Sequence, residues 1–207
     1  MFQTHDQRVF VPQGIPDLFS IMKRRPDCMI WAGGTYIGTS QIVRLDARNR
    51  DLISLQRIED LQRIFRTDRY LELGATVTLD RILRLSDRFA PASLKQAILA
   101  TVPAPARSLA TMGGNLCIAN EILNLLPWAA TVDARLEIRR QGSVRFVAAS
   151  KLMNSLGEPS LEIGEILTRI RIPIGRWNHQ VYQRIPRDEG TGSPGLGFCA
   201  LASIHKD

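Results

Sequence analysis

Two short segments contain the residues whose types and spacing have the clearest chemical potential. The first glycine segment, residues 32–38, reads Ala-Gly-Gly-Thr-Tyr-Ile-Gly, and the second, residues 111–117, reads Thr-Met-Gly-Gly-Asn-Leu-Cys. Adjacent glycines tolerate positive φ and leave N–H groups uncovered by a Cβ. Successive exposed N–H groups form a concavity that binds anions such as a diphosphate, and the nearby hydroxyls and amide can add hydrogen bonds. The two segments therefore predict a site for a phosphate-containing ligand.

Each segment taken alone also fits a simple turn. Neither has the Gly-x-Gly-x-x-Gly spacing of a Rossmann domain, and the sequence contains no Gly-x-x-x-x-Gly-Lys-Ser/Thr phosphate loop. Two such segments together are far more specific than either one.

The elements that must position the first segment alternate between strand and helix. We expect strands over residues 9–12, 28–32 and 52–55, and a helix over residues 15–24 with apolar residues at helical spacing, an acid in its first turn and bases in its last. The strand over residues 28–32 leads directly into the first glycine segment. The opening is thus predicted to be a β-α-β unit of about 55 residues.

The second segment is expected to lie in a structured loop over residues 107–120, whose small residues follow no steady period of 2 or 3.6. Around it, the expected strands cover residues 61–66, 70–73, 135–140, 144–147 and 163–172, and the expected helices cover residues 79–85, 94–101 and 125–132. A glycine-rich linker precedes a last strand over residues 198–204. That strand is expected to stand alone, which suggests that something after it has been cut away.

The composition is that of an ordinary globular protein. The chain has 207 residues, of which 44% are hydrophobic and 23% charged, as in an ordinary soluble globular protein. Its apolar runs are too short for a transmembrane helix, and its first residues do not resemble a signal peptide. We therefore expect a cytoplasmic protein that does not bind a membrane.

Metal and nucleic-acid sites are not indicated either. The three cysteines are far apart and form no Cys-x-x-Cys pair, so they predict neither a disulfide framework nor a zinc or iron–sulfur site. The three histidines share no ligand spacing. The net charge of +7 is spread along the chain without a nucleic-acid-binding motif, so it fits an acidic partner or an anionic cofactor equally well.

The sequence resembles a known family in several segments. The first segment matches the signature Ala-Gly-Gly-Thr/His-x-Leu/Ile, and residues 106–115, Ala-Arg-Ser-Leu-Ala-Thr-Met-Gly-Gly-Asn, match Ile-Arg-x-x-Ala-Thr-Ile-Gly-Gly-Asn. Residues 73–79 and 125–134 carry further family-like segments in the right order. Over residues 8–175 the chain is similar to the FAD-binding domain of the molybdopterin dehydrogenase family, found as the medium, flavin subunit of carbon monoxide dehydrogenase and in xanthine dehydrogenase.

The resemblance implies an α/β (α+β) fold in two subdomains that hold FAD between them. The expected divisions are residues 1–55, an N-terminal β-α-β subdomain, residues 56–175, a second FAD-binding subdomain, and residues 176–207, a linker and the first strand of a truncated C-terminal domain. The cofactor-binding residues that the resemblance implies are Ala32, Gly33, Gly34, Thr35, Tyr36, Ile37, Thr111, Gly113, Gly114, Asn115 and Asn124.

The resemblance also implies a function in electron transfer. Electrons would pass from a molybdopterin-containing large subunit through the [2Fe–2S] clusters of a small subunit to FAD, and then to NAD or another acceptor. The chain would be an oxidoreductase component without a catalytic acid or base and without a metal of its own, inactive in hydroxylation without its partners.

One segment departs from the family pattern. Where family members carry Ser-Pro-x-x-Asp, this chain has Asn120, Glu121 and Asn124. Asn124 can still accept a hydrogen bond, whereas Glu121 adds a negative charge near an anionic cofactor. The alternative is therefore a truncated, non-catalytic paralogue or assembly factor that keeps the fold without functional flavin.

Overall fold

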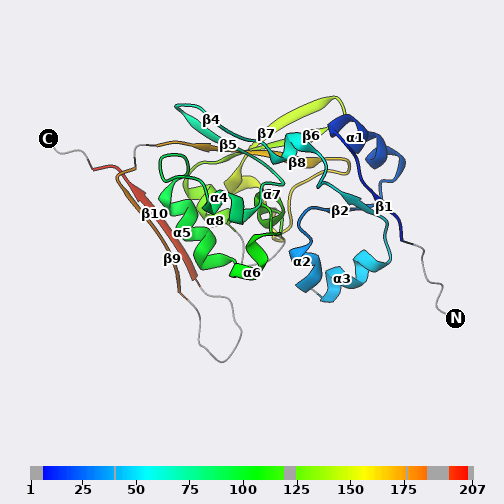
Figure 1. Cartoon of the computed structure of the whole chain (residues 1–207), viewed down its shortest axis with the longest axis horizontal. Helices are drawn as coiled ribbons and strands as arrows, with labels where there is room; N and C mark the ends of the chain where they lie inside the picture. The colour runs from blue at the N-terminus through cyan, green and yellow to red at the C-terminus, as the bar shows by residue number, and fades with distance from the viewer. Residues whose placement is uncertain (1–6, 40, 119–124, 176, 186–195, 205–207) are drawn as a thin grey trace.

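The computed structural model describes residues 7–39, 41–118, 125–175, 177–185 and 196–204. These residues form three sheets and the helices that pack on them (Figure 1). The strands are β1 Val9–Phe10, β2 Met29–Trp31, β3 Leu52–Ser54, β4 Ile64–Arg66, β5 Tyr70–Gly74, β6 Arg135–Arg140, β7 Ser143–Ala148, β8 Ile166–Pro173, β9 His179–Ile185 and β10 Leu196–Ala202. The helices are α1 Ile15–Arg24, α2 Thr35–Thr39, α3 Gln41–Arg48, α4 Leu79–Leu83, α5 Ala92–Thr101, α6 Ala104–Arg107, α7 Met112–Leu116 and α8 Leu126–Thr131, with short 3₁₀ turns η1 Glu59–Gln62 and η2 Ala149–Lys151.

The first sheet is small and parallel, in the order β1-β3-β2. Successive strands of a parallel sheet need crossover connections. Helix α1 connects β1 to β2, which lie on either side of β3, and α2 with α3 connect β2 to its neighbour β3. Helix α1 buries Leu18 and Ile21 in a cluster with Ile53 of β3. The predicted strands and the predicted helix over residues 15–24 are confirmed. Helices α2 and α3 were not predicted. In α2, glycine and threonine are weak helix formers.

The second sheet has five strands in the order β4-β5-β8-β6-β7, and every neighbouring pair is antiparallel. Helices α4, α5, α7 and α8 cover one of its faces, as Figure 1 shows. Leu71 of β5, Leu136 of β6 and Ile170 of β8 point into this core and are fully buried. Trp128 of α8 is also fully buried, and its indole N–H donates to the Ser93 hydroxyl at 3.0 Å. The mixed α/β class predicted from the sequence is confirmed.

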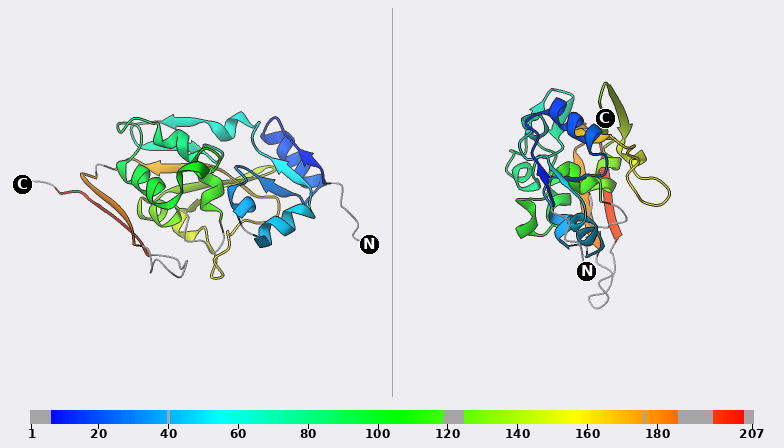
Figure 2. Two further views of the ribbon diagram at one scale, coloured as in Figure 1. Left: turned by 60° about the horizontal axis from the view of Figure 1, so that its bottom comes forward. Right: turned by 90° about the vertical axis from the view of Figure 1, so that its right-hand side faces the viewer.

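The third sheet corrects the expectation of a lone final strand. Strand β10 pairs antiparallel with β9 over its whole length, and both lie at the end of the molecule away from the parallel sheet (Figures 1 and 2). Gln180 and Tyr182 of β9 fasten this pair to α5, since the Gln180 side chain accepts from the Ser93 N–H and the Tyr182 N–H donates to the Gln96 side chain, both at 3.2 Å. Strand β9 was missed because polar residues dominate it.

The predicted loop over residues 107–120 is wrong in part, because it contains α7. The Thr111 hydroxyl caps this helix by accepting from the Gly114 N–H at 3.1 Å. Two glycines inside the helix lower its intrinsic propensity, so the sequence suggests a loop.

No helix in the described part of the chain is both long and apolar enough to span a bilayer.

A charged network is built into the five-stranded sheet. Glu137 of β6 is 4% exposed. Its carboxylate accepts from Arg139 at 2.7 Å and from the Thr168 hydroxyl at 2.8 Å. Burial by itself would raise the pKa of Glu137, but the hydrogen bonds from Arg139 and Thr168 and the charge of Arg169 hold it below its ordinary value of 4.5.

The network predicts a loss of stability in acid. Because the folded-state pKa of Glu137 is lowered, its contribution is present above pH 4.5 and is lost as the pH falls through the folded value. We expect the melting temperature of Glu137→Gln to fall less steeply than that of the wild type between about pH 5 and pH 3. Thermal unfolding followed by circular dichroism measures both slopes. The exposed carboxylate variant Glu59→Gln is the control, and equal slopes for Glu137→Gln and the wild type would contradict the prediction.

Candidate functional site

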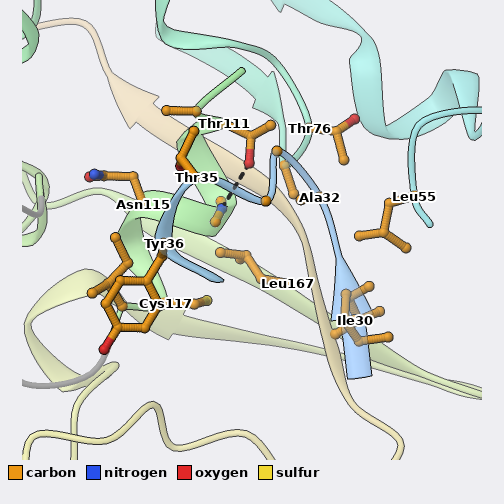
Figure 3. Close-up of a pocket in the computed structure, with 18 of the residues that line it drawn as sticks. Ile30, Ala32, Thr35, Tyr36, Leu55, Thr76, Thr111, Asn115, Cys117 and Leu167 are labelled. Atoms are coloured by element: carbon orange, nitrogen blue, oxygen red, sulfur yellow. Dashed lines mark hydrogen bonds between the residues drawn. The ribbon is translucent and has the colours of Figure 1, made fainter. Parts of the chain in front are cut away.

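The two glycine segments meet around one cavity of about 250 Å³. It lies between the parallel sheet with its helices and the larger sheet with α7, and Figure 3 shows part of its lining. The predicted site residues that line the cavity are Ala32, Gly33, Gly34, Thr35, Tyr36, Ile37, Thr111, Gly113, Gly114 and Asn115. Asn124 and Glu121 lie outside the described residues. The structure therefore brings together every predicted site residue that it describes.

The first segment continues directly from β2. Gly34 takes a left-handed conformation with φ of 68°, and a Cβ there would also overlap with the Trp31 ring. Helix α2 begins at the next residue. Within the described chain, the N–H groups of Gly33 and Gly34 make no hydrogen bond. These two donors are thus available for a ligand at the edge of the cavity.

The second segment is held by pairing with residues 75–79. The Leu79 N–H donates to Ala110 O, the Met112 N–H to Val77 O, and the Gly113 N–H to Ala75 O, at 2.8–2.9 Å. The Ala75 N–H in turn donates to Thr168 O in β8 at 3.0 Å. A continuous series of backbone contacts therefore fixes the second segment to the larger sheet.

The donors of the second segment differ from the expectation. Its Gly113, Gly114 and Asn115 N–H groups donate within the chain, to Ala75 O, the Thr111 hydroxyl and Thr111 O. An open row of N–H groups was expected here. That expectation is wrong because the segment forms a capped helix and its Gly113 N–H pairs with Ala75 O. Among the described glycines of the two segments, the donors that remain open are those of Gly33 and Gly34.

The glycines of both segments permit close approach of backbone. A Cβ on Gly33 would overlap with the carbonyl of Leu109, just before the second segment. A Cβ on Gly113 would lie 2.7 Å from the Ala75 Cβ, and one on Gly114 would lie 2.7 Å from the Thr111 hydroxyl. Gly33 therefore sets how closely the two segments approach.

Asn115 joins the second segment to α8. It is 5% exposed, and its side-chain oxygen accepts from the Leu125 N–H at 2.7 Å. The amide therefore satisfies a buried backbone donor just before α8 begins. Its expected ligand contacts would add to this structural role.

Several lining residues were not predicted as site residues. They are mainly apolar and come from β2 and β8 and from residues beside β3, β5, α7 and β8: Ile30, Leu55, Ala75, Thr76, Ala110, Cys117, Ile118, Leu161, Glu165, Ile166 and Leu167. Ala75 and Thr76 belong to the family-like segment 73–79, which was a usable signal. The residues from β8 gave no signal, because a buried strand residue has the same sequence pattern whether it lines a core or a cavity.

The described lining suits binding more than acid–base chemistry. Its one charged residue, Glu165, is paired with Arg145. Burial raises the pKa of the Cys117 thiol to about 12, so this thiol stays neutral at physiological pH. In the described residues, no group of histidine, cysteine and acidic side chains is arranged to hold a metal ion.

The chain is similar in sequence and fold to known proteins. Residues 2–175 match the family described as the FAD binding domain in molybdopterin dehydrogenase. The chain is 27% identical over 162 residues to the xanthine dehydrogenase FAD-binding subunit of Escherichia coli O157:H7, which covers 77% of this chain and 55% of that protein. The chain therefore spans about half the length of this curated relative.

Solved structures agree. A structure of quinoline 2-oxidoreductase from Pseudomonas putida 86 superposes with a TM-score of 0.86 and 25% identity, over 99% of this chain and 71% of that one. A cyanide-inactivated Cu,Mo-CO dehydrogenase gives a TM-score of 0.79 and 26% identity, over 89% of this chain and 65% of that one.

Proposed function

This chain belongs to the family of FAD-binding domains in molybdopterin dehydrogenases, and from this membership we propose that it is the flavin component of a molybdenum hydroxylase. In this proposal, electrons reach its FAD from the iron–sulfur clusters of a partner subunit and leave to NAD or another acceptor. The observation that carries the proposal is the single cavity in which both glycine segments of the family meet.

The residues of the cavity fit a dinucleotide. Gly33 and Gly34 present open N–H donors. A Cβ on Gly33 would overlap with the Leu109 carbonyl, and one on Gly34 with the Trp31 ring. Backbone donors of this kind bind phosphate oxygens without adding a positive side chain. FAD is too large to fit whole in a cavity of about 250 Å³, so the cavity would hold its central diphosphate and the adjoining groups. The neighbouring apolar side chains would exclude water from this part of the cofactor.

We further propose a role for each wall. The first segment, Ala32 to Ile37, would donate hydrogen bonds to the diphosphate. The second, with Thr111, Gly113, Gly114 and Asn115, would set the shape of the facing wall. When bound, FAD would supply the electron-carrying group, and the chain would position it and tune its potential. No acid or base is required of the chain.

The partners in this proposal are a molybdopterin-containing large subunit and a [2Fe–2S] small subunit. The support is that the matching structures are molybdenum-containing dehydrogenases or related oxidoreductases. We also propose a cytoplasmic location, and subdomains divided at residues 55 and 175. This division separates the parallel sheet from the five-stranded sheet and the β9–β10 pair.

The first test is cofactor content. We expect the chain purified with added FAD to show flavin absorbance, and acid precipitation to release FAD and not FMN, because the site would be built around a dinucleotide diphosphate. Absorption spectroscopy and chromatography of the released flavin measure both. A colourless protein without a thermal shift in millimolar FAD would contradict the proposal and favour a paralogue that keeps the fold without flavin.

A further inference from the structure

One wall of the cavity contains a charge that a phosphate ligand must tolerate. The segment leading into β8 contributes Leu161, Glu165, Ile166 and Leu167 to the lining. Glu165 is the one charged residue in the described lining, and its side chain is 5% exposed. A carboxylate at this depth would repel a doubly negative diphosphate, because Coulomb repulsion is strong where water is excluded.

Arg145 of β7 neutralises this carboxylate. Its Nε donates to Glu165 Oε1 at 2.7 Å and its Nη2 to Oε2 at 2.6 Å, a bidentate pair. The Glu162 N–H adds a third hydrogen bond to Oε2 at 2.9 Å, and Arg145 also donates to Ser160 O at 2.9 Å. The hydrogen bonds from Arg145 lower the pKa of Glu165, so the pair is fully ionised at neutral pH.

We propose that Arg145 is a positioning residue for FAD, which acts by neutralising Glu165 in the wall of the cofactor cavity. Arg145 is not among the residues that line the cavity, so its effect on the cofactor passes through Glu165. The inference rests on the proposed function, and binding of FAD to the wild-type chain tests that function separately.

The variants separate charge from packing. Arg145→Gln leaves a carboxylate without its cation in the wall of the cavity, and we expect FAD to bind tenfold or more weakly at pH 8. Glu165→Gln removes that carboxylate and leaves the Arg145 cation, so this variant should bind FAD at least as tightly as the wild type. The double variant Arg145→Gln/Glu165→Gln carries neither charge and should bind within about threefold of the wild type. Titration of FAD fluorescence measures all three.

The pH profile supplies a readout that a purely structural role would not change. Arg145→Gln removes the largest cause that lowers the pKa of Glu165, while burial still raises it and the Glu162 N–H and Arg140 still lower it. Glu165 should therefore take up a proton at a higher pH than in the wild type, and FAD affinity should recover as the pH is lowered. The wild type should show no recovery, because its Glu165 is already compensated. The nearby groups include Arg140 of β6 and Glu162 of the same segment, with Cys117 just after α7 and Tyr36 of α2 in the lining. The Cys117 thiol stays neutral because its pKa is raised to about 12.

Arg140→Gln is the matched control. Arg140 and Glu162 also join the β6–β7 hairpin to the segment before β8, at 3.3 Å, but their side chains are 54% and 68% exposed and line no part of the cavity. This variant should bind FAD as the wild type does.

Each outcome decides the inference. Wild-type affinity in Arg145→Gln would overturn it, as would equal weakening in Arg145→Gln and Glu165→Gln without recovery at low pH. If Arg145→Gln does not fold, Glu165→Gln decides, since a tenfold loss of affinity there would show that the pair is only a structural brace. A wild-type chain that binds no FAD would overturn the proposed function and this inference with it.

Discussion

Gly33→Ala is expected to abolish most FAD binding and to destabilise the chain. The added Cβ would overlap with the Leu109 carbonyl, which is backbone and cannot rotate away. The two glycine segments would have to separate, so both walls of the cavity would move. Overpacking of this kind costs about 1–3 kcal/mol of stability, and we expect FAD affinity to fall tenfold or more. Fluorescence titration with FAD and thermal unfolding measure the two effects.

Gly38→Ala is the matched control for this variant. Gly38 lies in α2, four residues after Gly34. A Cβ there would have no other atom within 4 Å. Since alanine favours a helix over glycine, this variant should be at least as stable as the wild type and bind FAD equally well. If Gly33→Ala also kept wild-type affinity, the close approach of the two segments would not be what forms the site.

Asn115→Ala is expected to have the second largest effect. The change removes the acceptor for the Leu125 N–H, and a buried donor without a partner costs about 1–3 kcal/mol. It also removes a polar group from the cavity lining. We therefore expect a lower melting temperature together with FAD binding that is weaker by tenfold or more, measured by thermal unfolding and by fluorescence titration.

Asn154→Ala separates these effects from a general loss of asparagine hydrogen bonds. The Asn154 side chain accepts from the Leu156 and Glu158 N–H groups at 2.9 Å, but it is exposed and lies outside the cavity lining. Its removal should leave FAD affinity unchanged. An Asn115→Ala variant that is destabilised but binds FAD normally would show that Asn115 supports the fold without contributing to the site.

Much of the secondary structure, and the family to which the chain belongs, could be predicted from the sequence by itself. Helix α1 and strand β6 lie where their patterns predicted them, because an amphipathic period with charged ends and a run flanked by a tight Gln-Gly turn are local signals. The two glycine segments were identified because backbone that must approach a phosphate or another backbone closely leaves few residue types besides glycine.

Only the tertiary structure decided what each glycine does. Gly33 and Gly113 each begin a Gly-Gly pair and look equivalent in the sequence. In the structure the Gly33 N–H is open, whereas the Gly113 N–H donates to Ala75 O. That difference depends on pairing between segments about 35 residues apart in the chain, which no local pattern encodes. The same holds for helix α7, because its two glycines make a helix hard to predict from the sequence. It also holds for the β9–β10 pair, because β9 is mostly polar. The Arg145–Glu165 pair is likewise hidden in the sequence, because only folding places one residue's charge inside the cavity wall and the other behind it.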